Sequence, residues 1–182
     1  MKKALTLSFL GLFLPTLLAA SQETALFDQP LLITSAGQGA EVRVVQVLAK
    51  RADLDSQFNN IAESQDLENI KTLILVLGVS MKGLGAAGLD KDKEKERVSR
   101  LIEEAGKTRI PLLCLHLGGE ARRGQLSDEF ITAFLPLAKM AIVVKSGNKD
   151  GLFNKICQEN NIPLIEVEKT VDILESLKKS FR

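Results

Sequence analysis

Runs of nearly all apolar residues alternate along the chain with stretches in which apolar residues recur at helical spacing. Val42, Val45 and Ala49 show that spacing, and the β-branched and aliphatic run Thr72–Leu77 precedes the next such stretch. Strands that are nearly all apolar are typical of a parallel sheet covered by helices on both faces. We therefore predict a three-layer α/β fold, with a doubly wound, mostly parallel sheet of five or six strands, flavodoxin-like or Rossmann-like. The expected strands are 30–34, 72–77, 111–117, 141–144 and 163–167, with 54–61 as a candidate short edge strand.

Local signals predict where several helices begin. A helix should start near Gly39, and Ser127 should cap another, since Asp and Glu follow it in the first turn. The charged run Asp90–Arg97 is predicted to form the solvated first turns of the helix that continues with Val98. A helical turn is expected at 66–69.

The first 21 residues are typical of a secretory signal peptide. Two lysines, Lys2 and Lys3, precede the apolar run Ala4–Ala20, and small residues at 19–21 fit a cleavage site. A membrane-spanning helix needs roughly 20 apolar residues without a central proline, whereas Pro15 interrupts this run. We expect residues 22–182 to form a single exported domain, periplasmic or extracellular, with no stable membrane anchor.

Bulk charge gives no indication of a nucleic-acid partner. Removal of Lys2 and Lys3 with the signal peptide changes the formal charge from +1 to −1, so the mature chain has no basic excess. Tyr and Trp are absent, which argues against stacking on sugars or nucleobases.

The two cysteines are predicted to be buried thiols. Cys114 falls inside an apolar strand, and Cys157 lies on the apolar face of a helix. With a single histidine in the chain, they lack the clustered ligand spacing of a zinc site. We expect no metal and no cofactor.

Glycines and cations gather in the predicted strand-to-helix loops. Right-handed crossovers place all these loops at one edge of the sheet, where open α/β sheets bind ligands. The opposite loops, 108–110 and 160–162, lack glycine clusters. We predict that this edge binds a small anionic ligand with a phosphate or carboxylate group. The expected ligand-binding residues are Arg122, Arg123, Lys82, Lys145, Gly37, Gly39, Gly83, Gly85, Gly119 and Asn148.

The two adjacent arginines are the strongest anion-binding candidates, because guanidinium groups pair bidentately with carboxylates and phosphates. The alternative is that both arginines are solvated and form ion pairs with Glu120 and Asp128. Asp150 is expected to cap the following helix, which leaves Lys145 as a ligand candidate.

Three residues could support catalysis. His116, the only histidine, could act as a general acid or base, with Glu120 as its partner. Ser80 could be a nucleophile activated by Lys82, although the Gly-x-Ser-x-Gly elbow is not complete here. The alternative is that His116 is a structural residue at a strand end, with its ring nitrogens hydrogen-bonded within the protein.

The run Gly83–Gly88 matches the dinucleotide-binding pattern Gly-x-Gly-x-x-Gly. It starts several residues after its strand, however, and no ribose-binding acid follows at the next strand end, which disfavours a nicotinamide or flavin.

Four of these segments, taken together, resemble an uncharacterised family of exported bacterial proteins, described as a domain of unknown function. The segments are 35–38, 77–88, 116–124 and 145–151. The resemblance implies an exported bacterial α/β domain and carries no activity, substrate or catalytic residue.

Three functions stay open at this point. The first is non-catalytic binding of a small anionic ligand. The second is a hydrolase or transferase acting on such a substrate with His116. The third is a module that docks to a membrane transporter or another envelope protein.

Overall fold

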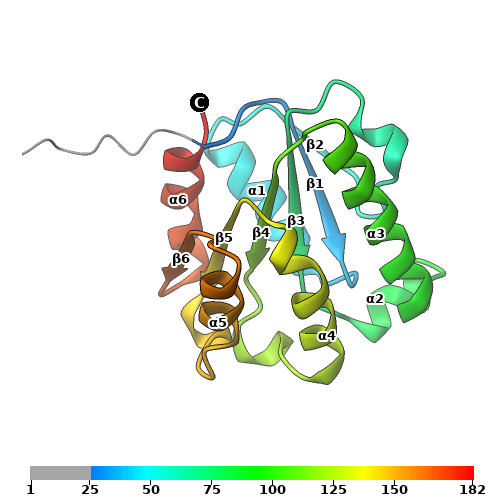
Figure 1. Cartoon of the computed structure of the whole chain (residues 1–182), viewed down its shortest axis with the longest axis vertical. Coiled ribbons are helices and arrows are strands. Elements are labelled where there is room, and N and C mark those ends of the chain that lie inside the picture. The colour runs from blue at the N-terminus through cyan, green and yellow to red at the C-terminus, as the bar shows by residue number, and fades with distance from the viewer. Residues whose placement is uncertain (1–25) are drawn as a thin grey trace, which may run out of the picture.

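A computed structural model describes residues 26–182, so the predicted signal peptide lies outside the described residues. Six parallel strands form one sheet in the order β2-β1-β3-β4-β5-β6 (Figure 1). This confirms the predicted α/β class and supplies the strand order. The strands are β1 (Leu31–Ala36), β2 (Ser56–Phe58), β3 (Thr72–Leu77), β4 (Leu112–His116), β5 (Met140–Val144) and β6 (Leu164–Val167).

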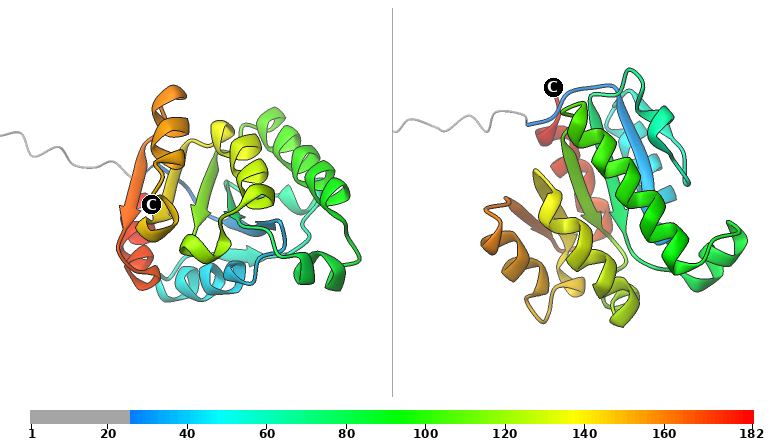
Figure 2. Two further views of the ribbon diagram at one scale, coloured as in Figure 1. Left: turned by 90° about the horizontal axis from the view of Figure 1, so that it is seen from below. Right: turned by 45° about the vertical axis from the view of Figure 1, so that its right-hand side comes forward.

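Helices cover both faces of the sheet, and Figure 2 shows the resulting three layers. α1 (Glu41–Arg51) and α6 (Ile173–Ser180) pack on one face, and α3 (Lys91–Lys107), α4 (Gln125–Phe134) and α5 (Leu152–Glu159) pack on the other. Each face has its own apolar core, because successive residues of a strand point to opposite sides. α2 (Met81–Ala86) follows β3. Short 3₁₀ helices complete the connections: η1 (Ser64–Leu67), η2 (Gly119–Arg122), η3 (Leu135–Leu137), η4 (Lys145–Gly147) and η5 (Thr170–Asp172).

The strand order defines where a ligand would be expected. From β1 the chain passes through α1 to β2 on one side, and from β3 it passes through α3 to β4 on the other. The loops after β1 and β3 therefore diverge at a topological switch point, the usual binding place in open α/β sheets.

Two local predictions are wrong. The run Asp90–Arg97 does begin α3, with Asp90 as its N-cap, but Glu94 and Arg97 within it are buried rather than solvated. Ser127 does not cap α4, because that helix begins at Gln125 after Gly124. The Ser127 hydroxyl accepts a hydrogen bond from the Val79 amide instead (3.1 Å), which ties α4 to the loop after β3.

Both cysteines are buried and unbridged, as predicted. Burial raises the pKa of the Cys114 thiol well above its usual value, and that of Cys157 to about 11. None of the helices between residues 26 and 182 is long and apolar enough to cross a bilayer. Over the same range, no three potential metal ligands cluster.

Candidate functional site

The turns after β1 and β3 pack directly against each other at the switch point. The Ser80 amide donates to the Gly37 carbonyl (2.8 Å), and Gln38 forms an isolated bridge with Val79. Gly37 has φ = 105°, a conformation that favours glycine, and a Cβ there would lie 2.6 Å from the Val79 side chain. A Cβ on Gly83 would collide with the Gln38 carbonyl oxygen. Gly37 and Gly83, predicted to give a ligand access to the backbone, therefore let the two turns approach each other.

A carboxylate from α3 accepts a hydrogen bond from a backbone amide in the turn after β1. Glu94 is fully buried, and its Oε1 accepts from the Gly37 amide (2.9 Å) and from Gln38 Nε2 (2.9 Å). Glycine-loop amides at this position are the groups that bind ligand anions in many α/β proteins. Here the protein's own carboxylate takes the Gly37 amide, so this amide is not free for a ligand.

Arg97 balances the charge of Glu94 and holds three segments together. Its Nε donates to Glu94 Oε2 (2.9 Å) and its Nη2 to Glu94 Oε1 (2.9 Å). The remaining donors reach the backbone carbonyls of Ser35 and Ala62, each at 2.6 Å. A buried ion pair is stable only when its other donors and acceptors are also satisfied, and this pair meets that condition. It fixes the turn after β1 against α3 and the loop before η1.

Sequence reasoning missed this pair because it lies within a charged run. A signal was present: Glu94 and Arg97 lie four and one residues before Val98, and seven and four before Leu101. These spacings continue the buried stripe of α3 towards its N-terminus. Charge alone was therefore a poor guide to exposure.

Arg122 lies across the switch point with part of its guanidinium unpaired. Its Nε donates to Glu41 Oε1 in the first turn of α1 (2.6 Å), and its alkyl chain packs on Gly118 and near Gly78. The side chain is 32% exposed. Within residues 26–182 its terminal nitrogens, Nη1 and Nη2, have no hydrogen-bond acceptor. Arg122 thus retains donors that an anion could use.

Arg123 differs sharply from its neighbour. It donates to both carboxylate oxygens of Asp128 (2.6 and 3.3 Å), to both of Asp150 (2.9 and 2.8 Å), and to the Gly147 carbonyl. The hydrogen bonds from Arg123 lower the pKa of Asp150 to about 2, and those to Asp150 and Asp128 raise the pKa of Arg123. The two carboxylates more than neutralise the charge of the Arg123 guanidinium. Arg123 therefore holds these loops together, and all its donors are already used.

His116 closes the end of β4 and is fully buried. Its Nδ1 lies 3.0 Å from the Leu77 carbonyl oxygen and its Nε2 lies 3.2 Å from that of Gly119. The ring also packs on Phe153, with centroids 5.1 Å apart. Burial lowers the pKa of His116, even though both carbonyls would favour the imidazolium. A ligand could touch this ring only if Gly119 or Gly147 moved, because a Cβ on Gly147 would lie 2.7 Å from it.

The other two catalytic candidates are engaged elsewhere. The Ser80 hydroxyl accepts from the Gly83 amide (3.1 Å) and caps α2. Glu120 pairs with Lys149 in an exposed ion pair, and that contact lowers the pKa of Glu120. Among the described contacts, none joins Ser80, His116 and Glu120.

Of the remaining predicted ligand residues, two are already paired within the protein and one is exposed without an ion pair. Lys145 pairs with Glu168 on the surface (2.7 Å), and the buried Asn148 accepts from the Phe153 amide (2.9 Å) at the start of α5. Lys82 is exposed on α2 and forms no ion pair with residues 26–182.

The structure therefore divides the predicted site into two neighbouring groups. The first surrounds the switch point and contains Gly37, Gly39, Ser80, Gly83 and Arg122, with Lys82 and Gly85 on the adjoining helix α2. The second surrounds η2 and η4 and contains His116, Gly119, Glu120, Arg123, Lys145 and Asn148.

Comparisons with known proteins place the chain in a family without assigning an activity. The structure is weakly similar to AlinE4, an SGNH-hydrolase family esterase, with a TM-score of 0.31 and 10% identity over 79% of this chain and 77% of the other. A mutant of the same esterase aligns with the same TM-score and identity over 80% and 78% of the two chains. No curated protein matches the sequence. A family model matches residues 28–181, and the chain belongs to that family, the domain of unknown function DUF6305.

Proposed function

We propose that this protein is an exported domain that binds a small anionic ligand, with a phosphate or carboxylate group, at the switch point of its sheet. Arg122 would supply the hydrogen-bond donors. The observation that carries this proposal is the unequal pairing of the two arginines: Arg123 has every donor occupied, whereas Arg122 keeps both terminal nitrogens free within the described range. Export is inferred from the sequence of residues 1–21.

The surroundings of Arg122 favour a small and specific ligand. Its Nε is held by Glu41, which limits the directions in which the guanidinium can turn. The exposed cation Lys82 follows the same β3 turn on which Arg122 packs. A planar fork with two free nitrogens suits a carboxylate or phosphate oxygen pair.

Binding is proposed rather than turnover because the catalytic candidates are committed to structural contacts. Ser80 caps a helix, and His116 is enclosed between two carbonyl oxygens. Neither group faces the free nitrogens of Arg122 in any described contact.

Isothermal titration at low ionic strength with two probes, inorganic phosphate and succinate, tests the proposal. We expect Arg122→Ala to weaken binding about tenfold or more, the usual effect of losing a charge-assisted hydrogen bond. Arg122→Lys should restore only part of the affinity, because an ammonium group cannot form the bidentate contact. Arg100→Ala is the matched control, since Arg100 is an exposed arginine paired with Glu96 on α3.

Two outcomes would refute the proposal: neither probe binds the native protein, or Arg122→Ala binds them as the native protein does. Native mass spectrometry of gently purified protein would identify a retained ligand. An added mass that is present in the native protein and lost in Arg122→Ala would place that ligand at this site.

A further inference from the structure

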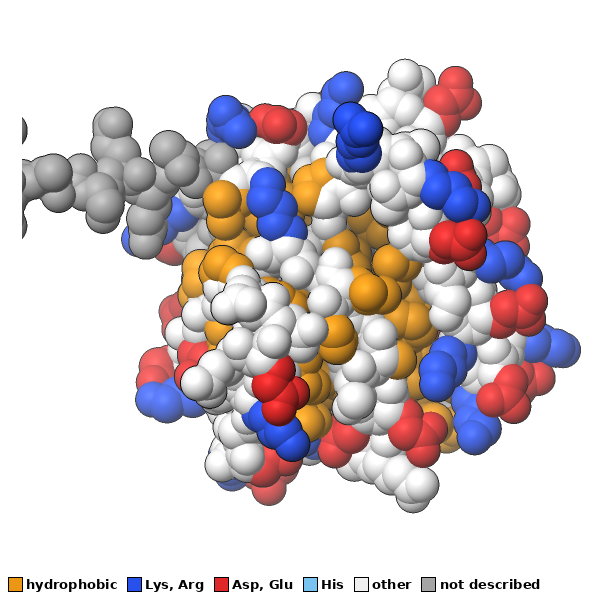
Figure 3. All heavy atoms as spheres, viewed as in Figure 1, with side chains coloured by type: hydrophobic (Ala, Val, Ile, Leu, Met, Phe, Trp, Pro, Cys, Tyr) orange, Lys and Arg blue, Asp and Glu red, His pale blue; other side chains and the backbone are white. Residues whose placement is uncertain are grey.

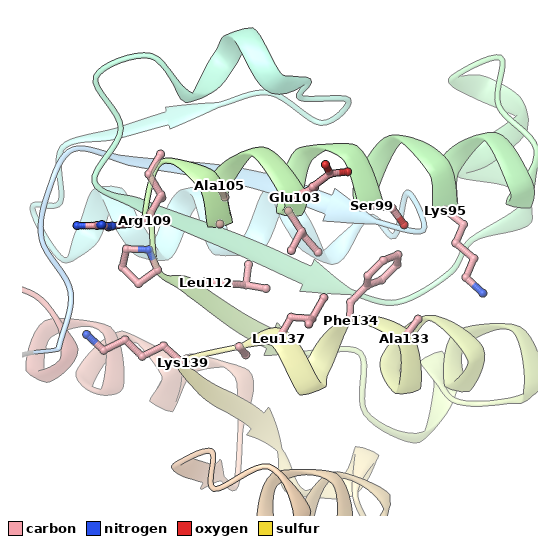
Figure 4. Close-up of a pocket in the computed structure, with 15 residues that line it drawn as sticks. Lys95, Ser99, Glu103, Ala105, Arg109, Leu112, Ala133, Phe134, Leu137 and Lys139 are labelled. Carbon is pink, nitrogen blue, oxygen red and sulfur yellow. The ribbon is translucent and has the colours of Figure 1, made fainter.

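An apolar groove runs between α3 and the α4–η3 segment, away from the carboxyl edge. Its volume is about 680 Å³. Figure 4 shows side chains from both walls and from the start of β4 directed into it, among them Leu112, Phe134 and Leu137. Figure 3 shows apolar side chains gathered in the hollow between these helices, open to solvent. Leu137 is 57% exposed although it is a large aliphatic residue.

Unequal helix lengths and small residues create the groove. α3 has 17 residues, whereas α4 has 10 and gives way to η3, which contains Pro136. Ser99, Gly106 and Ala133 line the walls at positions where longer side chains would fill the space. The floor of the groove therefore reaches Pro111 and Leu112 at the start of β4.

The rim of the groove carries cations without carboxylate partners. Figure 4 places Arg109 and Lys139 at one end and Lys95 at the other. None of the three forms an ion pair with any residue in the range 26–182, and Lys139 Nζ donates to the Leu26 carbonyl oxygen (2.9 Å). The single acid that lines the groove, Glu103, is already paired with Lys107 (2.9 Å). Three cations and one carboxylate thus line an apolar floor, and Asp128 and Glu129 lie in the adjoining hollow beside Lys95.

We propose that this groove binds an amphipathic helix of a partner protein, with an apolar ridge that enters the groove and acidic residues at both ends. Long open grooves between helices are a recurring site for such segments. Lys95 lies about three turns, roughly 18 Å at 1.5 Å per residue, before the end of α3 at Lys107, which Arg109 follows. The partner's acidic residues should therefore lie about three to four turns apart.

Charge and shape favour a partner helix over the other occupants. A second copy of this chain that packed groove to groove would bring the same cations face to face, which is unfavourable. The chain's own apolar run Ala4–Ala20 contains no acidic residue to meet the rim. A small molecule would need a site that encloses most of its surface, whereas this groove is open along its length.

The test uses two fluorescein-labelled synthetic peptides of 18 residues, on the order of five helical turns. Both carry leucines at helical spacing, one with glutamates at its ends and the other with lysines. Fluorescence anisotropy should show binding of the acidic peptide only. Leu137→Ser and the double variant Lys95→Glu, Lys139→Glu should each weaken it about tenfold. Val47→Ser is the matched control, because Val47 is similarly exposed, at 55%, on α1 over the opposite face.

Methyl NMR on the same samples locates the contact, and the shifts should centre on Ile102, Ala133 and Leu137. The proposal fails if the acidic peptide does not bind at millimolar concentration, or if both peptides bind equally. It also fails if the groove methyls shift with protein concentration alone and sedimentation shows a dimer, since a second copy would then be the occupant. Unchanged circular dichroism of each variant separates lost binding from lost folding.

Discussion

Protonation of His116 should destabilise the fold between pH 7.5 and pH 5.5. The side chain is fully buried, and burial lowers its pKa below the value of about 6.5 expected in an unfolded chain. Between the folded and unfolded pKa values the unfolded state binds more protons, so the free energy of unfolding rises with pH. The contribution is fully present above pH 6.5 and is lost as the pH falls through the folded pKa. Because His116 is the only histidine in the chain, no other side chain of ordinary pKa titrates in this window.

The size of the effect follows from the number of protons involved. One proton changes the free energy of unfolding by at most 1.36 kcal/mol per pH unit. The loss between pH 7.5 and pH 5.5 is at most about 1.4 kcal/mol, the limit in which His116 stays neutral in the fold. For a domain of this size, that limit corresponds to a fall in the melting temperature of at most about 3–6 °C.

Thermal unfolding followed by circular dichroism at pH 5.5, 6.5 and 7.5 would measure this loss, with His116→Gln as the comparison. The variant should be less stable at every pH, because it disturbs the contacts with Leu77 and Gly119, but its stability should not depend on pH in this range. The reasoning is refuted if both proteins show the same pH slope. It is also refuted if the Cε1 proton of His116 titrates at or above pH 6.5 in NMR spectra.

Three further experiments, two with substitutions and one with thiol labelling, test the contacts around the switch point and the core. Glu94→Ala should cost about 3–5 kcal/mol in chemical denaturation, because it leaves a buried guanidinium unpaired, whereas Glu96→Ala on the exposed side of α3 should cost under about 1 kcal/mol. Gly83→Ala should lower the free energy of unfolding by about 1–3 kcal/mol because its methyl group would meet the Gln38 carbonyl, while Gly85→Ala, which points into open space within α2, should raise it by up to about 1 kcal/mol. Both cysteine thiols should resist a thiol-specific chromogenic reagent at pH 8 until denaturant is added, since burial raises the pKa of each; rapid labelling of the native protein would contradict this.

The class of fold could be predicted from the sequence because the strand signal is local. β1, β3, β4 and β5 are buried along their whole length, and each contains at least three consecutive apolar residues. The order of the strands could not be predicted, since it depends on pairing between segments far apart in the chain. β2 gave the weakest signal because it has three residues and only one neighbour, and the sequence indicated it only as a candidate edge strand.

The candidate site was predictable as a region but not residue by residue. Arg122 and Arg123 are adjacent and chemically identical, so only the fold distinguishes them. The carboxylates that occupy Arg123 come from five and 27 residues further along the chain, while the acid that orients Arg122 lies 81 residues earlier. Which acid meets which arginine is decided by loop geometry, and no local pattern encodes it.

The carboxyl edge is organised by the protein's own carboxylates, and this limits what a ligand can do there. Glu94 accepts a hydrogen bond from the Gly37 amide in the turn after β1, and Asp128 and Asp150 neutralise Arg123. Loops held by such contacts are ordered before a ligand arrives, so binding would cost little further conformational entropy. The same contacts neutralise Arg123, so that a ligand bound at the proposed site would rely on the free nitrogens of Arg122. A site of this kind should therefore bind through a few well-directed hydrogen bonds rather than through a strong field, and its specificity should depend more on the geometry of the anion than on its total charge.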